Sequence, residues 1–229
     1  MEYILLPGKN PISEDQKFHK IAYDFWYTNW SNFFKKHDPS YILNPDDFFR
    51  QDYIGLLAEG EIPLAIHLYS VFDLSIPYQL NQSYLSYNFA PTFFSTILGD
   101  GIKRVMTFEA MMVNPDYRKT ETGKSIAPML FAEGIQLIKS IKNIDAMIAP
   151  ARRDIGVTKL AHSGGAETIV DHDLHGIPVS LIVGKTEKLH LNFLGEFEQY
   201  KAIQIFNNQR NLNVILSKES YGNIKKIAS

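Results

Sequence analysis

The chain has 229 residues, of which 45% are hydrophobic and 13% aromatic, so it can bury a sizeable core and lies at the upper end of one domain. A formal net charge of -2 gives no basic field for nucleic acid or for an anionic membrane. The sequence contains no cysteine, which excludes a disulfide framework, a thiolate metal site and a cysteine nucleophile. It shows neither an apolar leader nor a long apolar run, so we expect a cytoplasmic protein.

The first part of the chain predicts a helix and a β-hairpin. Aromatic and aliphatic residues recur at helical spacing over residues 14–36, which indicates an amphipathic helix with an aromatic face. A short helix or turn is expected at 44–51. Two strands follow at 53–58 and 62–72, joined by the turn Glu59-Gly60-Glu61.

Residues 74–99 carry no charged side chain. The segment is rich in Tyr and Phe among Ser, Asn, Gln and Pro, and it is too long for a simple hairpin loop. One interpretation is the wall of an apolar substrate site or tunnel, with Tyr84, Tyr87 and Phe93 binding substrate. The other is a segment that packs down as a lid or a dimer contact and has no role toward a ligand.

The next strand, expected at 102–113, contains a carboxylate among apolar residues. Alternation puts Thr107, Glu109 and Met111 on one face of this strand. The opposite face is expected to hold the apolar row Met106, Phe108, Ala110 and Met112. Because the strand should be central in its sheet, a salt bridge or a substrate anchor is a more natural role for Glu109 than a passive surface position.

The remaining elements alternate helices and strands. We expect a helix at 125–141, a strand at 144–149, a helix at 152–162, hairpin strands at 166–172 and 177–184, and a helical extension from residue 189 with a polar tail. Scattered histidines without paired spacing predict no metal site.

The stretch RKTETGKS, residues 118–125, lies between the strand at 102–113 and the helix that follows it. It ends like a P-loop, but Arg118 stands where that motif requires its first glycine, which disfavours an ATPase. A loop that leads into a helix N-terminus nevertheless offers unpaired N–H groups and the positive end of the helix dipole to a pyrophosphate. The alternative is a solvated turn before an ordinary helix.

The order of the elements and the run from Met112 to Arg118, MVNPDYR, resemble the GNAT acyltransferase superfamily. That family ends a strand with an apolar pair, a polar residue and Pro-Asp-Tyr-Arg, then continues with (Arg/Gln)-x-x-Gly-x-(Gly/Ala) into a helix. Residues 158–165 are similar to the later family helix that closes with Lys-Leu-Gly-Phe. Here two extra residues precede Gly123, and the tyrosine that often protonates the leaving thiolate is missing.

This resemblance implies an α/β (α+β) fold with a mixed, mostly antiparallel central sheet flanked by helices. It implies a GNAT-like domain at 1–188, with a long insertion at 74–101 between the third and fourth strands. A helical C-terminal extension and tail would occupy 189–229. The aromatic first helix and the insertion are similar in this respect to the N-acyl amino acid synthase branch of the superfamily.

The resemblance also implies an N-acyltransferase whose co-substrate is a coenzyme A thioester, with no metal. Glu109 would act as base, and His162 or Tyr117 would supply the proton to the thiolate. The cofactor would be held by Met111, Met112, Val113, Arg118, Lys119, Thr122, Gly123, Lys124 and Ser125. The acceptor would be a small-molecule amine or amino acid, with an acyl carrier protein as alternative donor and a homodimer left open. A catalytically inactive binding or scaffold module is the competing interpretation.

Overall fold

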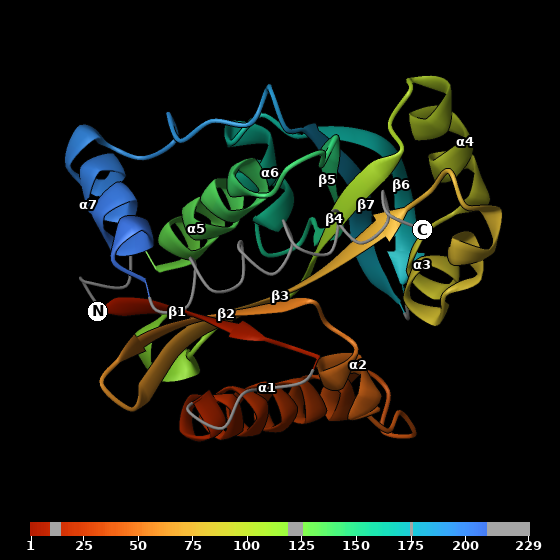
Figure 1. The fold of residues 1–229 in the computed structure, drawn as a ribbon. Coiled ribbons are helices and arrows are strands. Elements are labelled where there is room, and N and C mark those ends of the chain that lie inside the picture. The colour runs from red at the N-terminus through yellow and green to blue at the C-terminus, as the bar shows by residue number, and fades with distance from the viewer. Residues whose placement is uncertain (10–14, 119–125, 175, 210–229) are drawn as a thin grey trace, which may run out of the picture.

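The computed structural model of the chain describes residues 1–9, 15–118, 126–174 and 176–209. It shows a seven-stranded sheet in the order β1-β2-β3-β4-β5-β7-β6, with helices on both faces (Figure 1). Neighbouring strands are antiparallel except β4 and β5, which are parallel. The mixed, mostly antiparallel sheet that the sequence predicts is therefore confirmed.

The elements agree with the expected ones to within a few residues in most cases. The strands are β1 (Glu2–Pro7), β2 (Tyr53–Glu59), β3 (Ile62–Asp73), β4 (Arg104–Val113), β5 (Ala146–Arg152), β6 (Glu167–Leu174) and β7 (Ile177–Lys185). The helices are α1 (Gln16–His37), α2 (Asp46–Phe49), α3 (Ser83–Asn88), α4 (Pro91–Gly99), α5 (Ile126–Ser140), α6 (Val157–Ser163) and α7 (Glu196–Asn207), with 3-10 turns η2 (Pro77–Asn81) and η3 (Pro115–Tyr117).

The edge strand β1 is a correction, because the sequence interpretation begins with a helix. The strand pairs antiparallel with β2 over its whole length. Its residues from Tyr3 to Leu6 are fully apolar and buried, with helices packed on both sides. A strand covered on both faces shows a continuous apolar run instead of alternation, and this short run was not recognised as one.

Helices α5, α6 and α7 cover one face of the sheet (Figure 1). Side chains of β4 such as Met106 and Phe108 pack there against α5. The helix lies so close to the sheet that a Cβ at Gly134 would come within 2.7 Å of the Phe108 ring. This face therefore holds a densely packed core.

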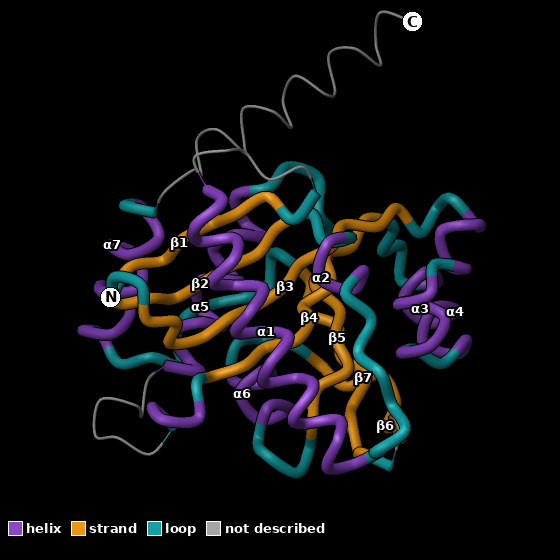
Figure 2. The backbone as a smooth tube through the Cα atoms, turned by 90° about the horizontal axis from the view of Figure 1, so that it is seen from below, coloured by secondary structure: helices purple, strands orange, loops and turns teal. Residues whose placement is uncertain are grey.

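The opposite face is covered in two halves. Helices α1 and α2 pack on β1 to β4, where Trp26 and Phe48 are buried, and Figure 2 shows α1 running across the strands. Helices α3 and α4 pack on β4 to β7, where Phe93 is buried. The apolar cluster under α1 and α2 contains Leu68, and the cluster under α3 and α4 contains Phe72, four residues further along β3. Residues an even number apart on a strand point to the same side, so both clusters lie on one face of the sheet.

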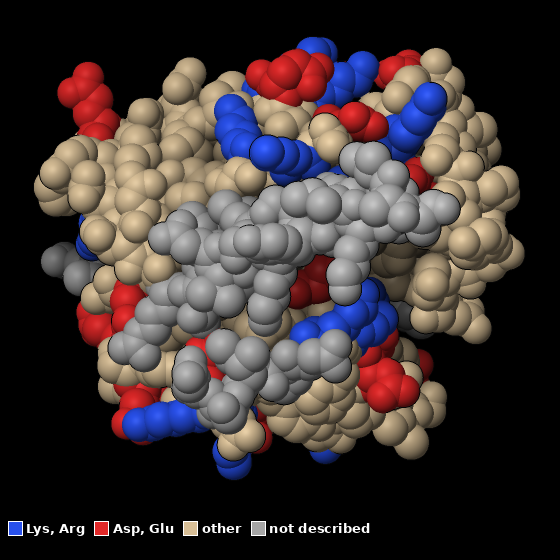
Figure 3. Space-filling model, in the orientation of Figure 1, with Lys and Arg blue, Asp and Glu red and all other residues tan. Residues whose placement is uncertain are grey.

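The segment between β3 and β4 folds as η2, α3 and α4. Phe89, Phe93 and Phe94 pack against one another in tilted and edge-to-face contacts, with ring centroids 5.0 to 5.5 Å apart, in the core on the sheet. The side of the molecule that α3 and α4 occupy is largely uncharged in Figure 3, as the composition requires. Much of the aromatic content of the insertion is thus explained by packing.

A β-bulge in β4 corrects the expected alternation. Leu68 pairs with Glu109 while Ile66 pairs with Met112, so β4 holds one residue more than β3 at this point. Ala110 has a φ of 50°, which L-residues rarely adopt. Beyond the bulge the faces exchange, so Ala110 and Met112 lie with the α1 cluster instead of continuing the row on the α5 face.

The C-terminal helix α7 packs against α5 and β1. Its buried residues Ala202 and Phe206 join the core beneath α5. The proposed division at residue 188 stays a prediction, and residues 210–229 of the expected tail lie outside the described ones. Over the ranges that the structure describes, we find no helix with the length and apolar character needed to cross a membrane.

Candidate active site

A band of polar side chains crosses the sheet between the two apolar halves of the α1 face. Ser70 of β3 separates residues of the two clusters, and Thr107 and Glu109 continue the band on β4. Gln51 approaches from the segment between α2 and β2. All four side chains are buried, which is unusual for polar groups unless they are paired.

Glu109 is held by four hydrogen bonds. Arg50 donates from Nη1 to Oε1 at 3.3 Å and from Nη2 to Oε2 at 2.5 Å. Gln51 Nε2 donates to Oε2 at 3.0 Å, and Thr107 Oγ1 donates to Oε1 at 2.5 Å. Ser70 Oγ in turn donates to Gln51 Oε1 at 2.7 Å, so the band fixes the orientation of the carboxylate.

Arg50 is the charged partner of this carboxylate. It follows α2 directly, at the point where the chain turns toward β2, and its guanidinium lies 4.6 Å from the centroid of the Tyr84 ring on α3. Burial lowers the pKa of Arg50, but the charge and hydrogen bonds of Glu109 outweigh it and raise the pKa. Burial, and next the charge of Glu109, raises the pKa of Tyr84 well above its ordinary value. Arg50 is therefore cationic and Tyr84 a neutral phenol.

Strands β4 and β5 diverge beside this band. Their pairing runs only from Val105 to Thr107 on β4, opposite Ala146 to Ile148 on β5. Beyond it β4 continues to Val113 and β5 to Arg152, and β5 stays paired on its other side with β7. Backbone groups of β4 beyond Thr107 thus face β5 without ladder bonds, next to the bulge and to Glu109.

Helix α1 lies across the diverging strands on the face that carries Glu109. Trp30 Nε1 donates to the carbonyl oxygen of Ala110 at the bulge, 3.4 Å away. One turn on, Phe33 lies under the guanidinium of Arg152 at the end of β5, with 4.8 Å to the ring centroid. Aromatic residues of α1 thus touch both diverging strands.

The predicted proton donors lie away from this band. His162 is an exposed residue of α6, on the α5 side of the sheet, and its Nε2 lies 2.8 Å from Thr168 Oγ1. Tyr117 packs at the end of β4 against the α5 core. The structure thus does not bring either of them together with Glu109.

The expected cofactor residues fall into two groups. Met111 and Val113 face α5, Met112 faces α1, and Arg118 Nε donates to the carbonyl oxygen of Val113 at 3.0 Å. The other five, Lys119, Thr122, Gly123, Lys124 and Ser125, lie outside the described residues. The described chain resumes at Ile126, the first described residue of α5, on the face opposite Glu109.

The three aromatics assigned to the substrate have different surroundings. Tyr84 contacts the cation of the polar band, Tyr87 is 79% exposed, and Phe93 is completely buried in the α3–α4 core. Only Tyr84 therefore touches the candidate site.

Arg50 and Gln51 were missed by the sequence interpretation. They are 59 and 58 residues from Glu109, so neither period nor spacing connects them to it. The sequence offered one signal for them, because Arg50 and Gln51 are a basic and an amide residue that stand just before the apolar strand expected at 53–58.

Two other buried polar residues lie on the α5 face and outside the band. Burial raises the pKa of Glu133 to about 9 and lowers that of His67 to about 3, so both are neutral near pH 7. Glu133 Oε1 and His67 Nδ1 have no hydrogen-bond partner among the described residues. His67 packs edge-to-face on Phe108 of β4, with 4.9 Å between the ring centroids.

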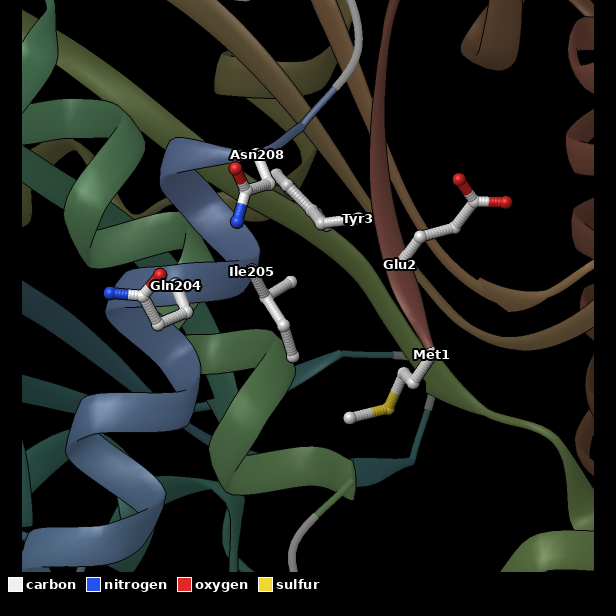
Figure 4. A pocket seen from close by; sticks show the side chains of 6 residues that line it. All are labelled: Met1, Glu2, Tyr3, Gln204, Ile205 and Asn208. Carbon is white, nitrogen blue, oxygen red and sulfur yellow. The ribbon is translucent and has the colours of Figure 1, made fainter.

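A shallow pocket of about 160 Å³ lies between the start of β1 and α7 (Figure 4). It is lined by Met1, Glu2, Tyr3, Gln204, Ile205 and Asn208. The carboxylate of Glu2 points away from α7 in Figure 4, and the volume is below the roughly 300 Å³ of small ligand sites. We do not assign catalysis to this pocket.

No protein-family model and no curated protein matches the sequence. Among solved structures, BjaI, a CoA-dependent acyl-homoserine lactone synthase with SAM and isopentyl-CoA, is 9% identical, with a TM-score of 0.54 over 91% of this chain and 92% of its own. Arylalkylamine N-acetyltransferase 2 from Aedes aegypti is 11% identical, with a TM-score of 0.54 over 80% and 99%. Mosquito arylalkylamine N-acetyltransferase like 5b is 14% identical, with a TM-score of 0.51 over 79% and 98%. These likenesses establish the fold, which is the GNAT fold that the sequence predicts.

Proposed function

We propose that the protein is an N-acyltransferase that moves an acyl group from acyl-CoA to an amine. The observation that carries the proposal is the divergence of β4 and β5 beside the bulge, with an oriented carboxylate at its edge. The amide groups of a thioester arm can pair with backbone groups of a strand, and β4 beyond Thr107 has no ladder pairing with β5. The likeness in fold to BjaI, which is CoA-dependent, and to the two arylalkylamine N-acetyltransferases supports this choice.

In the proposed reaction the amine arrives as an ammonium and is attracted to Glu109, which takes its proton directly or through a water molecule. The amine nitrogen then attacks the thioester carbonyl carbon. A backbone N–H near Met111 and Met112 binds the resulting oxyanion. When the intermediate collapses, the C–S bond breaks, and the second proton that the nitrogen gives up passes through water to the thiolate.

The pyrophosphate of coenzyme A is assigned to the loop from Arg118 to the start of α5. Support comes from the described ends of this loop, which connect β4 to a helix N-terminus on the face opposite Glu109. The pantetheine arm would then pass between the strands, and the acceptor would enter from the α1 side. A carrier-protein donor, a homodimer and a cytoplasmic location stay predictions.

The second candidate is an inactive module that binds coenzyme A without catalysis. It is favoured by one observation, namely that both oxygens of Glu109 already accept hydrogen bonds from the chain itself. In this alternative the carboxylate serves to hold α2 on the sheet.

We expect acyl-CoA to stabilise the protein against heat. A ligand that binds only the native state adds about 2.7 kcal/mol at a hundredfold excess over its Kd. For a chain of this size that corresponds to a rise in melting temperature of about 5 to 10 °C. Thermal melts with coenzyme A, a long-chain acyl-CoA and Mg-ATP measure it. Stabilisation by Mg-ATP alone, or by none of the three, would contradict the proposal.

A further inference from the structure

We propose that Arg152 binds a carboxylate of the acceptor, so that the acceptor is an amine that also carries a carboxylate group, as an amino acid does. This inference rests on the proposed function and deepens it. It assigns the substrate class from a side chain outside the polar band of Glu109.

Arg152 lies on the same face of the sheet as Glu109. Along β5, Met147, Ala149 and Ala151 belong to the α5 core, so the alternate residues Ile148 and Arg152 lie on the other face. Thr107 pairs with Ile148 in register, and Glu109 follows Thr107 by two residues. Glu109 on β4 and Arg152 on β5 therefore lie on the same face of the sheet, each beyond the last paired residue of its strand.

The guanidinium of Arg152 is oriented by its neighbours. Its plane lies over Phe33, and its Nε and Nη2 donate to Asp154 at 2.9 and 2.5 Å. Nη1 has no hydrogen-bond partner among the described residues. A guanidinium stacked on an aromatic ring presents a rigid fork that matches a carboxylate in two-point contact.

Asp154 marks the position that the acceptor carboxylate would take. It lies in the turn after β5, the side chains of Arg152 and Asp154 are 21% and 39% exposed, and both Asp154 oxygens accept from Arg152. A ligand carboxylate can bond to Nη1 beside Asp154, or it can take the two-point position while Asp154 moves into water. The fork is then filled by the ligand.

The other cations near the site are already engaged. Arg50 is held by Glu109, Asp47 and the Tyr84 ring. Arg153 points to β6, where its Nη1 donates to Asp171 at 2.9 Å. Arg152 differs from Arg153 in that its guanidinium lies against α1, on the face of the sheet that carries Glu109.

We favour a carboxylate of the acceptor, over the phosphates of coenzyme A, as the anion that Arg152 binds. The loop assigned to the pyrophosphate leads into α5, which covers the opposite face of the sheet. Arg152 instead faces α1, from which the acceptor would enter. Substitution of Arg152 should therefore change the KM of the amine and leave the KM of acyl-CoA unchanged.

The test measures release of the coenzyme A thiol from hexanoyl-CoA, with each common L-amino acid beside its own carboxamide. We expect the wild-type protein to prefer the best amino acid over its amide by about 10- to 100-fold in kcat/KM, consistent with one charged two-point contact of roughly 1.5 to 3 kcal/mol. Arg152→Gln should reduce this preference to less than threefold with the KM of hexanoyl-CoA unchanged. Arg153→Gln, the matched control, should keep it.

A second variant keeps the inference testable if Arg152→Gln does not fold. Asp154→Asn removes the internal competitor and should lower the KM of the amino acid about two- to fivefold. If the Arg152–Asp154 pair is purely structural, Arg152→Gln and Asp154→Asn should lower the unfolding free energy equally and leave the KM of the amine unchanged. That result would overturn the inference. Equal rates with acid and amide also overturn it, whereas no transfer to any amine refutes the proposed function as well.

Discussion

Replacing Glu109 by Gln is expected to lower kcat by about a hundred- to a thousandfold. General base catalysis by a positioned carboxylate contributes typically 10²- to 10⁴-fold, and the amide that replaces it cannot accept the proton. The replacement retains the shape of the side chain, so the KM of acyl-CoA should stay within about twofold. Steady-state thiol release over a range of pH measures the loss and the altered profile.

Arg50→Gln is the control that separates catalysis from structure. It breaks the same ion pair from the other side and leaves the 4% exposed carboxylate without its counter-ion, at a cost of about 3 kcal/mol in unfolding free energy. If Glu109 is the base, kcat should fall no more than about tenfold in this variant. If Glu109 only holds α2 on the sheet, the two variants should lose rate and stability together, and the base assignment would be wrong.

Glu133 is expected to make the unfolding free energy decrease between about pH 4.5 and pH 9. Burial raises the pKa of its carboxyl from 4.5 to about 9 in the folded protein. Below pH 4.5 both the folded and the unfolded chain carry this proton. Above that pH only the folded chain does, so folding must take up a proton and stability declines by about 1.4 kcal/mol per pH unit until the folded pKa is reached.

Glu133→Gln should therefore stabilise the protein near neutrality. The amide resembles the protonated acid, keeps an oxygen for Gln136, whose Nε2 lies 3.5 Å from Glu133 Oε2, and has no charge to neutralise. About 2.5 pH units separate pH 7 from the ordinary pKa of 4.5, so we expect a gain of about 3 kcal/mol at pH 7 and about 0.7 kcal/mol at pH 5.

Denaturant unfolding at pH 5 and pH 7 tests this prediction. His67 must also be kept neutral, but it is present in both proteins, so its effect cancels in the comparison. The exposed Glu187→Gln is the matched control and should change the unfolding free energy by less than about 0.5 kcal/mol at either pH. A gain from Glu133→Gln that is equal at the two pH values would contradict the assignment of a buried neutral carboxyl.

Local patterns in the sequence were sufficient for most of the elements. The aromatic face of α1 follows from the 3.6-residue period, because the helix buries one face. The β2–β3 hairpin follows from two strand-like runs on either side of the turn Glu59-Gly60-Glu61. Glu109 stood out because a carboxylate in an otherwise apolar central strand requires a partner or a task. Its burial and its pairing agree with that expectation.

Long-range features could not be read in this way. The partners of Glu109 come from a turn more than fifty residues earlier, and only the folded sheet brings them together. The bulge at Ala110 depends on a backbone conformation that the residue type does not reveal, and it reverses the facing of the rest of β4. Likewise the charge-free segment predicted burial, but whether Phe93 packs in a core or lines a tunnel depends on where the chain places α4.

The proposed acyl transfer is tested most directly by mass spectrometry of the protein incubated with hexanoyl-CoA and a pool of amines, with thiol release followed in parallel. The account predicts an N-hexanoyl amide and free coenzyme A in equal amounts, formed by the wild-type protein and at least a hundredfold more slowly by Glu109→Gln. Binding of hexanoyl-CoA with neither product formed would contradict it and would identify the protein as an inactive module with the GNAT fold.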